Sequence, residues 1–173
     1  MSSINYDLTK IKCFIFDVDG VLSPDSIPLY PDGEPMRVVN IKDGFALNLA
    51  CKKGYGVAII TGGDTEAVKK RFTRLGIKHV YMKSSIKIND YKHFIEQTGY
   101  KPEEIAYAGD DLPDYQVMKL VGLPVAPADA APEIKGIAKY VSHKKGGDGV
   151  GRDIIEQVLK AQGNWICDEA FGW

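Results

Sequence analysis

The sequence predicts an α/β fold built as a doubly wound parallel sheet, and three observations lead to this prediction. Short apolar runs alternate with helical patterns along most of the chain. Polar residues and glycines close several of these runs, as they do where the strands of such sheets end at a ligand site. The chain has 173 residues and an ordinary content of charged and apolar residues, which favours one domain over residues 1–173.

The first elements surround a segment that we expect to project from the sheet. Residues 10–18 form a β-branched and aromatic run that ends in acidic residues, which predicts a buried strand. Residues 27–41 place a Pro-Asp-Gly turn between two extended stretches, and the prolines in both stretches exclude a central strand, so we expect a projecting β-hairpin. Asp43 is expected to cap a helix that ends near residue 53.

The remaining elements alternate regularly between strands and helices. Helices separate successive strands, so the strands are expected to pair in parallel through right-handed crossovers. The sequence contains no internal repeat and no low-complexity linker. The expected strands span residues 56–60, 79–82, 105–108, 123–126 and 139–142, and the expected helices span residues 64–75, 86–98, 113–121, 132–138 and 150–161.

Composition excludes several classes of function. The net charge is −1, so the chain lacks the basic excess with which proteins neutralise a nucleic-acid backbone. Its apolar runs are too short to cross a membrane, and its polar start does not resemble a signal peptide, so we expect a cytoplasmic protein. The three cysteines have no CxxC spacing and are interpreted as buried or incidental thiols.

Acidic residues close two of the expected strands. Asp17 and Asp19 follow the first strand and start from the same side of it, because strand side chains repeat every two residues. Asp110 brings a third carboxylate from the end of the 105–108 strand. Close carboxylates need a cation between them, and oxygen ligands without histidine or cysteine favour Mg²⁺ over zinc.

The ordered set of motifs resembles the haloacid dehalogenase-like phosphatases. An apolar strand runs into DVDGV, a second strand into TG, a lysine begins a helix, and a further strand runs into GDDLPD. The resemblance implies that Asp17 attacks phosphorus, that Asp19 protonates the leaving alcohol and then activates water, and that Lys87 offsets charge on the phosphoryl group. It also implies that Thr61 and the backbone amide of Gly62 hold phosphate oxygens.

The same resemblance assigns the metal site. It implies that Mg²⁺ is bound by Asp17, by the backbone carbonyl of Asp19 and by Asp110. Asp111 and Asp114 are then expected to orient water and Lys87, although Asp114 is also a candidate cap for the helix after Pro113.

The spacing between motifs leaves no room for a separate cap domain. The stretch from Asp17 to Thr61 is filled by the hairpin, a helix and a strand, and the stretch from Lys87 to Asp110 by a helix and a strand. An uncovered site needs a macromolecular substrate or a neighbouring subunit to exclude water. The apolar residues of the hairpin favour a neighbouring subunit, with folding back onto its own domain as the alternative.

The resemblance is narrowed by the hairpin, the stretch of residues 40–44, Arg71, the GDDLPD segment and the closing GGDG followed by Arg152. Together they are similar to the capless 3-deoxy-D-manno-octulosonate 8-phosphate phosphatases of lipopolysaccharide precursor synthesis. This resemblance implies a homotetramer whose hairpins form a central barrel and whose adjacent subunit helps to enclose a phosphorylated sugar acid. The candidate substrate-binding residues are Gly62, Gly63, Arg71 and Asp43, and Arg71 is also a candidate for a subunit contact or a surface ion pair.

Three departures from the family pattern bear on specificity. Gly63 stands where a larger and often charged residue is common, Lys83 where glycine is common, and residues 23–25 read Ser-Pro-Asp where Thr-Asp-Gly is common. The aromatic tail of residues 164–173 favours docking, either on its own chain or toward a neighbouring site, over a free end.

These features predict hydrolysis of 3-deoxy-D-manno-octulosonate 8-phosphate. A nine-carbon 2-keto-3-deoxy sugar acid 9-phosphate is the alternative substrate. A non-catalytic phosphosugar-binding module and a protein phosphatase are two further candidate functions. The set of Asp17, Asp19, Thr61, Lys87 and Asp110 argues against the binding module, because binding alone needs no nucleophile.

Overall fold

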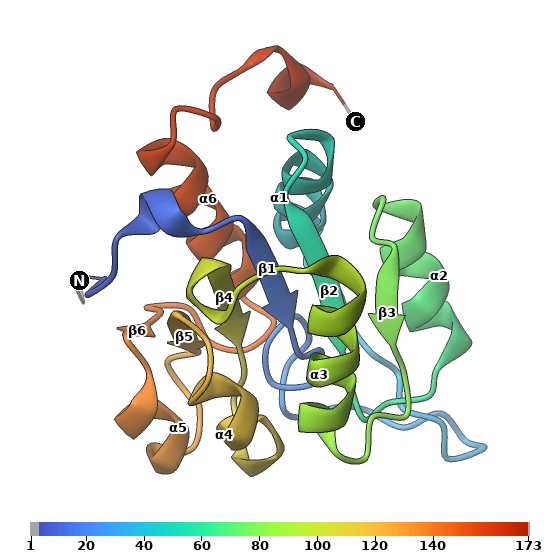
Figure 1. The fold of residues 1–173 in the computed structure, drawn as a ribbon. Helices are drawn as coiled ribbons and strands as arrows, with labels where there is room; N and C mark the ends of the chain where they lie inside the picture. Colours follow the sequence, from blue (N-terminus) through green and yellow to red (C-terminus); the bar gives the residue numbers. More distant parts are fainter. Residues whose placement is uncertain (1–3, 173) are drawn as a thin grey trace.

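The protein is described here by a computed structural model that covers residues 4–172. A six-stranded sheet forms its centre, with the strand order β3-β2-β1-β4-β5-β6 and all pairs parallel (Figure 1). The strands are β1 (Cys13–Phe16), β2 (Gly56–Ile60), β3 (His79–Tyr81), β4 (Ile105–Ala108), β5 (Leu123–Ala126) and β6 (Tyr140–Val141).

Within the described residues, six α-helices cover the two faces of this sheet. They are α1 (Ile41–Lys52), α2 (Glu66–Arg74), α3 (Lys87–Thr98), α4 (Leu112–Met118), α5 (Pro132–Ile137) and α6 (Val150–Ala161), and short 3-10 helices lie at η1 (Leu8–Lys10), η2 (Pro102–Glu104) and η3 (Asp168–Phe171). Each α-helix contains residues that the sequence assigned to a helix, and no helix end differs from its predicted position by more than three residues. The doubly wound architecture predicted from the sequence is confirmed.

Alternation along β1 explains why both faces carry a core. Phe14 and Phe16 are buried in one apolar cluster with residues of α1, α2 and α6. Cys13 and Ile15 point to the other side and are buried in a second cluster with residues of α3, α4 and α5. Because the side-chain period of a strand is two, four consecutive apolar residues supply two cores.

The strand order locates the ligand-binding edge. β1 is central and pairs with β2 on one side and with β4 on the other, so the direction of chain winding reverses between β1 and β4. In open α/β sheets, ligands bind beyond the carboxyl ends of the strands at this reversal. Asp17 and Asp110 each follow one of these two strands.

The start of α1 differs from the sequence prediction. Asn40, and not Asp43, caps the helix, because its Oδ1 accepts hydrogen bonds from the backbone amides of Lys42 (2.8 Å) and Asp43 (3.3 Å). Asparagine and aspartate are comparable caps, so the sequence preference for Asp43 was weak. Asp43 therefore lies inside the first turn of α1.

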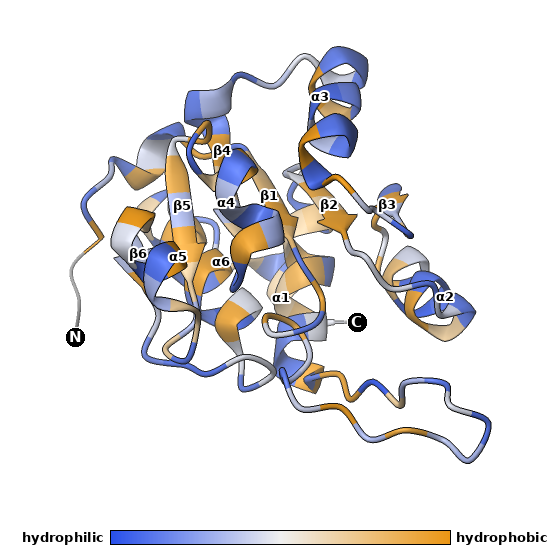
Figure 2. Cartoon of the chain, turned by 90° about the horizontal axis from the view of Figure 1, so that it is seen from below, coloured by the Kyte–Doolittle hydropathy of each residue, from blue (hydrophilic) through white to orange (hydrophobic). Residues whose placement is uncertain are grey.

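Residues 27–41 project from the body of the protein, as Figure 2 shows. The segment turns back on itself through one antiparallel bridge between Leu29 and Pro35 and a 2.8 Å hydrogen bond from Met36 N to the carbonyl of Pro28. No β-strand is assigned to residues 27–40. Prolines remove backbone donors from both arms, which limits the ladder, so the projection is found but a regular hairpin is not.

The described part of the tail docks on its own chain. The Trp165 ring meets Phe45 of α1 edge to face at 6.2 Å between centroids, and the Arg152 guanidinium of α6 lies 4.3 Å from the Trp165 ring centre. The tail thus lies beyond the amino ends of the strands, opposite the carboxyl ends that carry Asp17 and Asp110 (Figure 1). Trp173 and residues 1–3 lie outside the described residues. No helix within residues 4–172 is long and apolar enough to cross a membrane.

Candidate active site

Three carboxylates and one lysine meet at the carboxyl ends of β1 and β4. Lys87 begins α3, and its Nζ lies 2.7 Å from Oδ2 of Asp17 and 2.7 Å from Oδ1 of Asp114. Asp17, Asp110 and Asp114 each offer a carboxylate oxygen, and these three atoms lie within 4.8 Å of one another. The structure therefore brings together Asp17, Asp110 and Lys87, which lie far apart in the sequence.

Both carboxylate oxygens of Asp114 accept hydrogen bonds from neighbouring groups. Its Oδ1 also accepts a 2.6 Å hydrogen bond from the Tyr107 hydroxyl, and its Oδ2 accepts from the Asp110 amide at 3.2 Å. The side chain is buried. Asp114 thus orients Lys87 and the loop after β4, whereas Asp111 caps α4 by accepting from the amide of Leu112 at 2.8 Å.

The electrostatics of this cluster fit a divalent cation. Burial raises the pKa of Asp17, and the nearby Asp114 carboxylate raises it further, against the opposing effect of Lys87. Burial and Asp114 likewise raise the pKa of Asp110 to about 7. When ionised, the three carboxylates exceed the charge of Lys87 by two negative charges. An ion such as Mg²⁺ takes oxygen ligands and offsets such an excess, so the donor set suits it.

Gly20 is required by the close approach of Asp110. Its φ is +81°, and a Cβ at this position would lie 2.0 Å from Oδ2 of Asp110. Only glycine tolerates both this backbone conformation and this contact. Gly20, the glycine of the DVDGV motif, therefore leaves the space that the Asp110 carboxylate occupies.

A cavity of about 400 Å³ opens beside Asp17 and Asp19 and is also lined by Thr61, Gly62, Gly63 and Lys87. Thr61 directly follows β2 and is buried, and its Oγ1 accepts a 3.2 Å hydrogen bond from the amide of Gly63. Thus the predicted catalytic residues and two of the four predicted substrate-binding residues lie around one space. Ser84 lines the same cavity and donates a hydrogen bond to Asp90.

Sequence reasoning missed Arg37, which comes from the projecting segment and lines this cavity. Its Nε lies 2.7 Å from Oδ1 of Asp19, and its Nη2 lies 2.8 Å from Oδ2, so the guanidinium clamps both carboxylate oxygens. Its Nη1 donates to Oγ1 of Thr65 at 2.6 Å. The only signal in the sequence is a single basic residue in a proline-rich segment, between Met36 and Val38.

Asp43 and Arg71 do not line this cavity. Asp43 is buried, and its Oδ1 accepts a 2.6 Å hydrogen bond from the amide of Arg152 in the first turn of α6. The Arg71 guanidinium lies against Gly44, at the start of α1. Asp43 and Arg71, the other two predicted substrate-binding residues, thus lie at the junction of α1, α2 and α6. Lys83 pairs with Asp64 at 2.7 Å, and both side chains are exposed.

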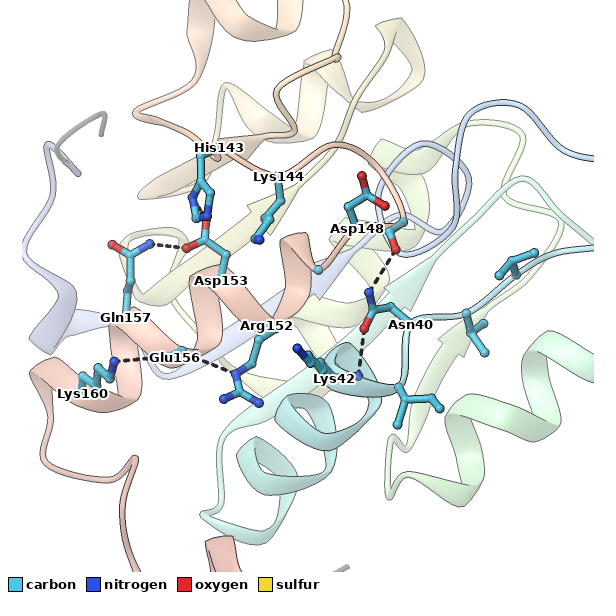
Figure 3. Close-up of a pocket in the computed structure, with 15 residues that line it drawn as sticks. Asn40, Lys42, His143, Lys144, Asp148, Arg152, Asp153, Glu156, Gln157 and Lys160 are labelled. Carbon is cyan, nitrogen blue, oxygen red and sulfur yellow. Dashed lines mark hydrogen bonds and ion pairs between the residues drawn. The ribbon is translucent and has the colours of Figure 1, made fainter.

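A larger cavity of about 760 Å³ lies between the start of α1 and α6 and contains none of the predicted site residues (Figure 3). Its charged side chains largely pair with one another. Arg152 and Lys160 both bind Glu156, at 2.7 and 2.6 Å, and Asn40 donates to the carbonyl of Gly147 at 3.2 Å. Four Lys and Arg side chains line this cavity against three carboxylates, so it has no excess of carboxylates of the kind found at the strand ends.

Comparison with known proteins agrees with this geometry. Residues 74–154 match the family model of haloacid dehalogenase-like hydrolases. The 3-deoxy-D-manno-octulosonate 8-phosphate phosphatase of Salmonella typhi is 42% identical, over 94% of this chain and 86% of that protein. The corresponding phosphatase of Escherichia coli K12 is 41% identical over the same shares.

Solved structures agree with these sequence matches. The phosphatase of this name from Yersinia pestis superimposes with a TM-score of 0.88 at 38% identity, over 91% of this chain and 85% of that one. The enzyme of Moraxella catarrhalis, solved with magnesium, phosphate and KDO, gives a TM-score of 0.87 at 31% identity, over 91% of each chain. The chain therefore belongs to the 3-deoxy-D-manno-octulosonate 8-phosphate phosphatase family of the haloacid dehalogenase-like hydrolases.

Proposed function

We propose that this protein is a magnesium-dependent phosphatase that hydrolyses 3-deoxy-D-manno-octulosonate 8-phosphate to the free sugar acid and phosphate. The observation that carries the proposal is the Lys87 ammonium between Asp17 and Asp114, 2.7 Å from each, beside a cavity at the strand ends. A buried carboxylate held by a lysine next to an open cavity is a nucleophile in a place that a phosphate ester can reach.

The reaction proceeds in two displacements at phosphorus. An Asp17 carboxylate oxygen forms a bond to phosphorus while the bond from phosphorus to the sugar oxygen breaks, and Asp19 gives its proton to that oxygen. Asp19 then takes a proton from water, whose oxygen attacks phosphorus and breaks the bond to Asp17. The products are the sugar acid and inorganic phosphate, and both aspartates return to their starting states.

Magnesium would be held by the side chains of Asp17 and Asp110 and by the backbone carbonyl of Asp19. When bound, it offsets the negative charge of the phosphoryl group and of the two carboxylates. Asp114 is already engaged by Lys87, Tyr107 and the Asp110 amide, so it serves to orient these groups. Thr61 and the amide of Gly62, which line the same cavity, bind phosphoryl oxygens, and Lys87 supplies a fixed positive charge.

Phosphate release identifies the substrate. The eight-carbon ester, a nine-carbon 2-keto-3-deoxy sugar acid 9-phosphate and a hexose phosphate are compared with and without Mg²⁺. We expect a preference for the eight-carbon ester and dependence on the metal. A preference for the nine-carbon ester assigns the alternative substrate, and equal slow turnover of all three refutes both sugar acids.

Asp17→Asn tests the mechanism. Asparagine keeps the shape of the side chain but is no nucleophile toward phosphorus, so activity should be lost. Asp168→Asn, in the exposed 3-10 helix of the tail, removes the same charge far from the site and should leave turnover unchanged. Activity that survives in the Asp17→Asn variant refutes the aspartyl-phosphate route.

The proposal includes a homotetramer in the cytoplasm. Leu29, Val38 and Ile41 expose 65%, 58% and 71% of their surfaces on or beside the projecting segment, which favours contact with other copies of the chain. The free thiols of Cys13, Cys51 and Cys167 suit a reducing compartment. Light scattering of the purified protein tests the assembly, and a monomer at micromolar concentration contradicts it.

A further inference from the structure

Arg37 enters the site from the projecting segment. Its side chain is only 7% exposed, although much of the segment that carries it is exposed. The guanidinium is fixed by both carboxylate oxygens of Asp19 and by the hydroxyl of Thr65. A long cationic side chain that is buried beside a catalytic carboxylate, and that lines the cavity, is placed to act on what the cavity binds.

Gly63 provides the space that the guanidinium occupies. A Cβ on residue 63 would lie 2.6 Å from Nη2 of Arg37 and 3.0 Å from its Cζ. The first distance is too short for nonbonded atoms and the second is tight, so a side chain at position 63 shifts the guanidinium from this position. Arg37 can therefore occupy this part of the cavity because residue 63 has no side chain.

We propose that Arg37 is a substrate-binding residue that takes an anionic oxygen group of the substrate, and that glycine at position 63 admits it to the site. This inference rests on the proposed phosphatase function. A guanidinium carries five N–H donors, and three of them are used by Asp19 and Thr65 within residues 4–172. Two donors are left for a ligand.

Charge explains why the site needs this cation. Lys87 lies between Asp17 and Asp114, so it does not offset the charge that Asp19 carries once it has given up its proton. A phosphorylated sugar acid brings a phosphate and a carboxylate toward that side chain, and like charges repel at short range. Arg37 counters this repulsion, and its planar fork matches either anionic group.

Binding measurements distinguish the two anions. Calorimetry with inorganic phosphate, and separately with the free 3-deoxy-D-manno-octulosonate, is performed on the full chain in the presence of Mg²⁺. We expect Arg37→Met to weaken one or both ligands by about tenfold to a hundredfold, as the loss of a charged hydrogen bond does. Arg37→Lys should recover part of this loss. Weakened phosphate assigns Arg37 to the phosphoryl group, and weakened sugar acid assigns it to the carboxylate.

The role of Gly63 is tested by a double-mutant cycle. Gly63→Ala should weaken the same ligand as Arg37→Met, and the double variant should be no weaker than Arg37→Met alone, because the added methyl group acts only by shifting the guanidinium. Lys92→Met, an exposed cation of α3, and Gly136→Ala, with open space around it, are the matched controls. Thermal unfolding of each variant verifies that the fold is kept.

Two results overturn the proposal. If Arg37→Met binds both ligands as tightly as Lys92→Met does, Arg37 does not bind substrate. If Gly63→Ala binds like Gly136→Ala while Arg37→Met is weakened, glycine at 63 is not what admits the arginine. Phosphate binding does not require turnover, so these results are distinct from a failure of the proposed substrate, which appears as absent hydrolysis with phosphate binding retained.

Discussion

Replacing Asp43 by asparagine should remove a pH-dependent loss of stability. Asp43 is 2% exposed, and within residues 4–172 no group donates a hydrogen bond to its Oδ2. Burial raises the pKa of this carboxyl group to about 6, although the Arg152 amide at Oδ1 opposes the shift. The fold therefore contains a carboxylate that is poorly stabilised when it is charged.

The sign and size of the effect follow from the two states. The unfolded chain releases the Asp43 proton near pH 4 and the folded chain near pH 6, so the folded state holds more protons in between. The free energy of unfolding therefore falls as pH rises through this window. A shift of roughly two pKa units, at about 1.4 kcal/mol per unit, corresponds to about 3 kcal/mol.

Urea denaturation of the wild type and of Asp43→Asn between pH 4 and pH 8 measures this effect. The buried amide adds a cost that is independent of pH, so the useful quantity is the change with pH in the difference between the two proteins. We expect the variant to gain about 3 kcal/mol relative to wild type from pH 4 to pH 8. A difference that stays flat over this range refutes the reasoning.

Activity of the same variant examines the substrate-binding role that the sequence assigned to Asp43. The side chain does not line the cavity beside Asp17. We therefore expect phosphate release by Asp43→Asn to match wild type wherever both proteins are folded. A raised KM with unchanged stability would instead support contact with the substrate, through an arrangement that a single chain does not contain.

Three further changes probe the site and the tail. Lys87→Met leaves buried carboxylates without their cation and should lower the free energy of unfolding by about 3 to 5 kcal/mol in metal-free buffer. Adding Mg²⁺ should recover part of this loss, and unchanged stability in urea would contradict the prediction. Gly20→Ala should weaken Mg²⁺ binding at least about tenfold in calorimetry, because its Cβ would displace the Asp110 carboxylate, whereas Gly33→Ala, which has the same backbone strain and open surroundings, should bind normally. Trp165→Ala loses a cation–π contact of about 1 kcal/mol and should speed limited proteolysis of residues 164–172, and an unchanged cleavage rate would show that other contacts retain the tail.

The sequence predicted the structure well where a local pattern is typical of only one kind of element. An apolar run that ends in alternating aspartates predicted both β1 and the edge on which Asp17 lies. The position of Lys87 at the start of α3 was predicted for the same reason, because strand and helix patterns on both sides of it are clear. Such local patterns, combined with the winding rule of parallel sheets, were enough to bring distant residues to one edge.

The sequence was uninformative where the outcome depends on packing between distant segments. Asn40 and Asp43 are both good caps, and only the contact of Asp43 with the Arg152 amide across to α6 explains why it lies inside the turn. Arg37 follows a stretch of prolines with no periodic pattern, so nothing local places its side chain 2.7 Å from Asp19. Long-range contacts of this kind carry no signature in a single sequence.

The projecting segment connects the open side of the site to an exposed apolar surface, on which a second chain would pack in the proposed homotetramer. Apart from its single bridge and a few backbone hydrogen bonds, the segment is fixed mainly by Arg37 at Asp19 and by Asn40 at the start of α1. Several of its apolar side chains are exposed to solvent, so the segment lacks the stabilisation that their burial would give. Packing of another copy against these residues would therefore reduce the freedom of the segment and, through it, the freedom of the one guanidinium that the segment delivers to the cavity.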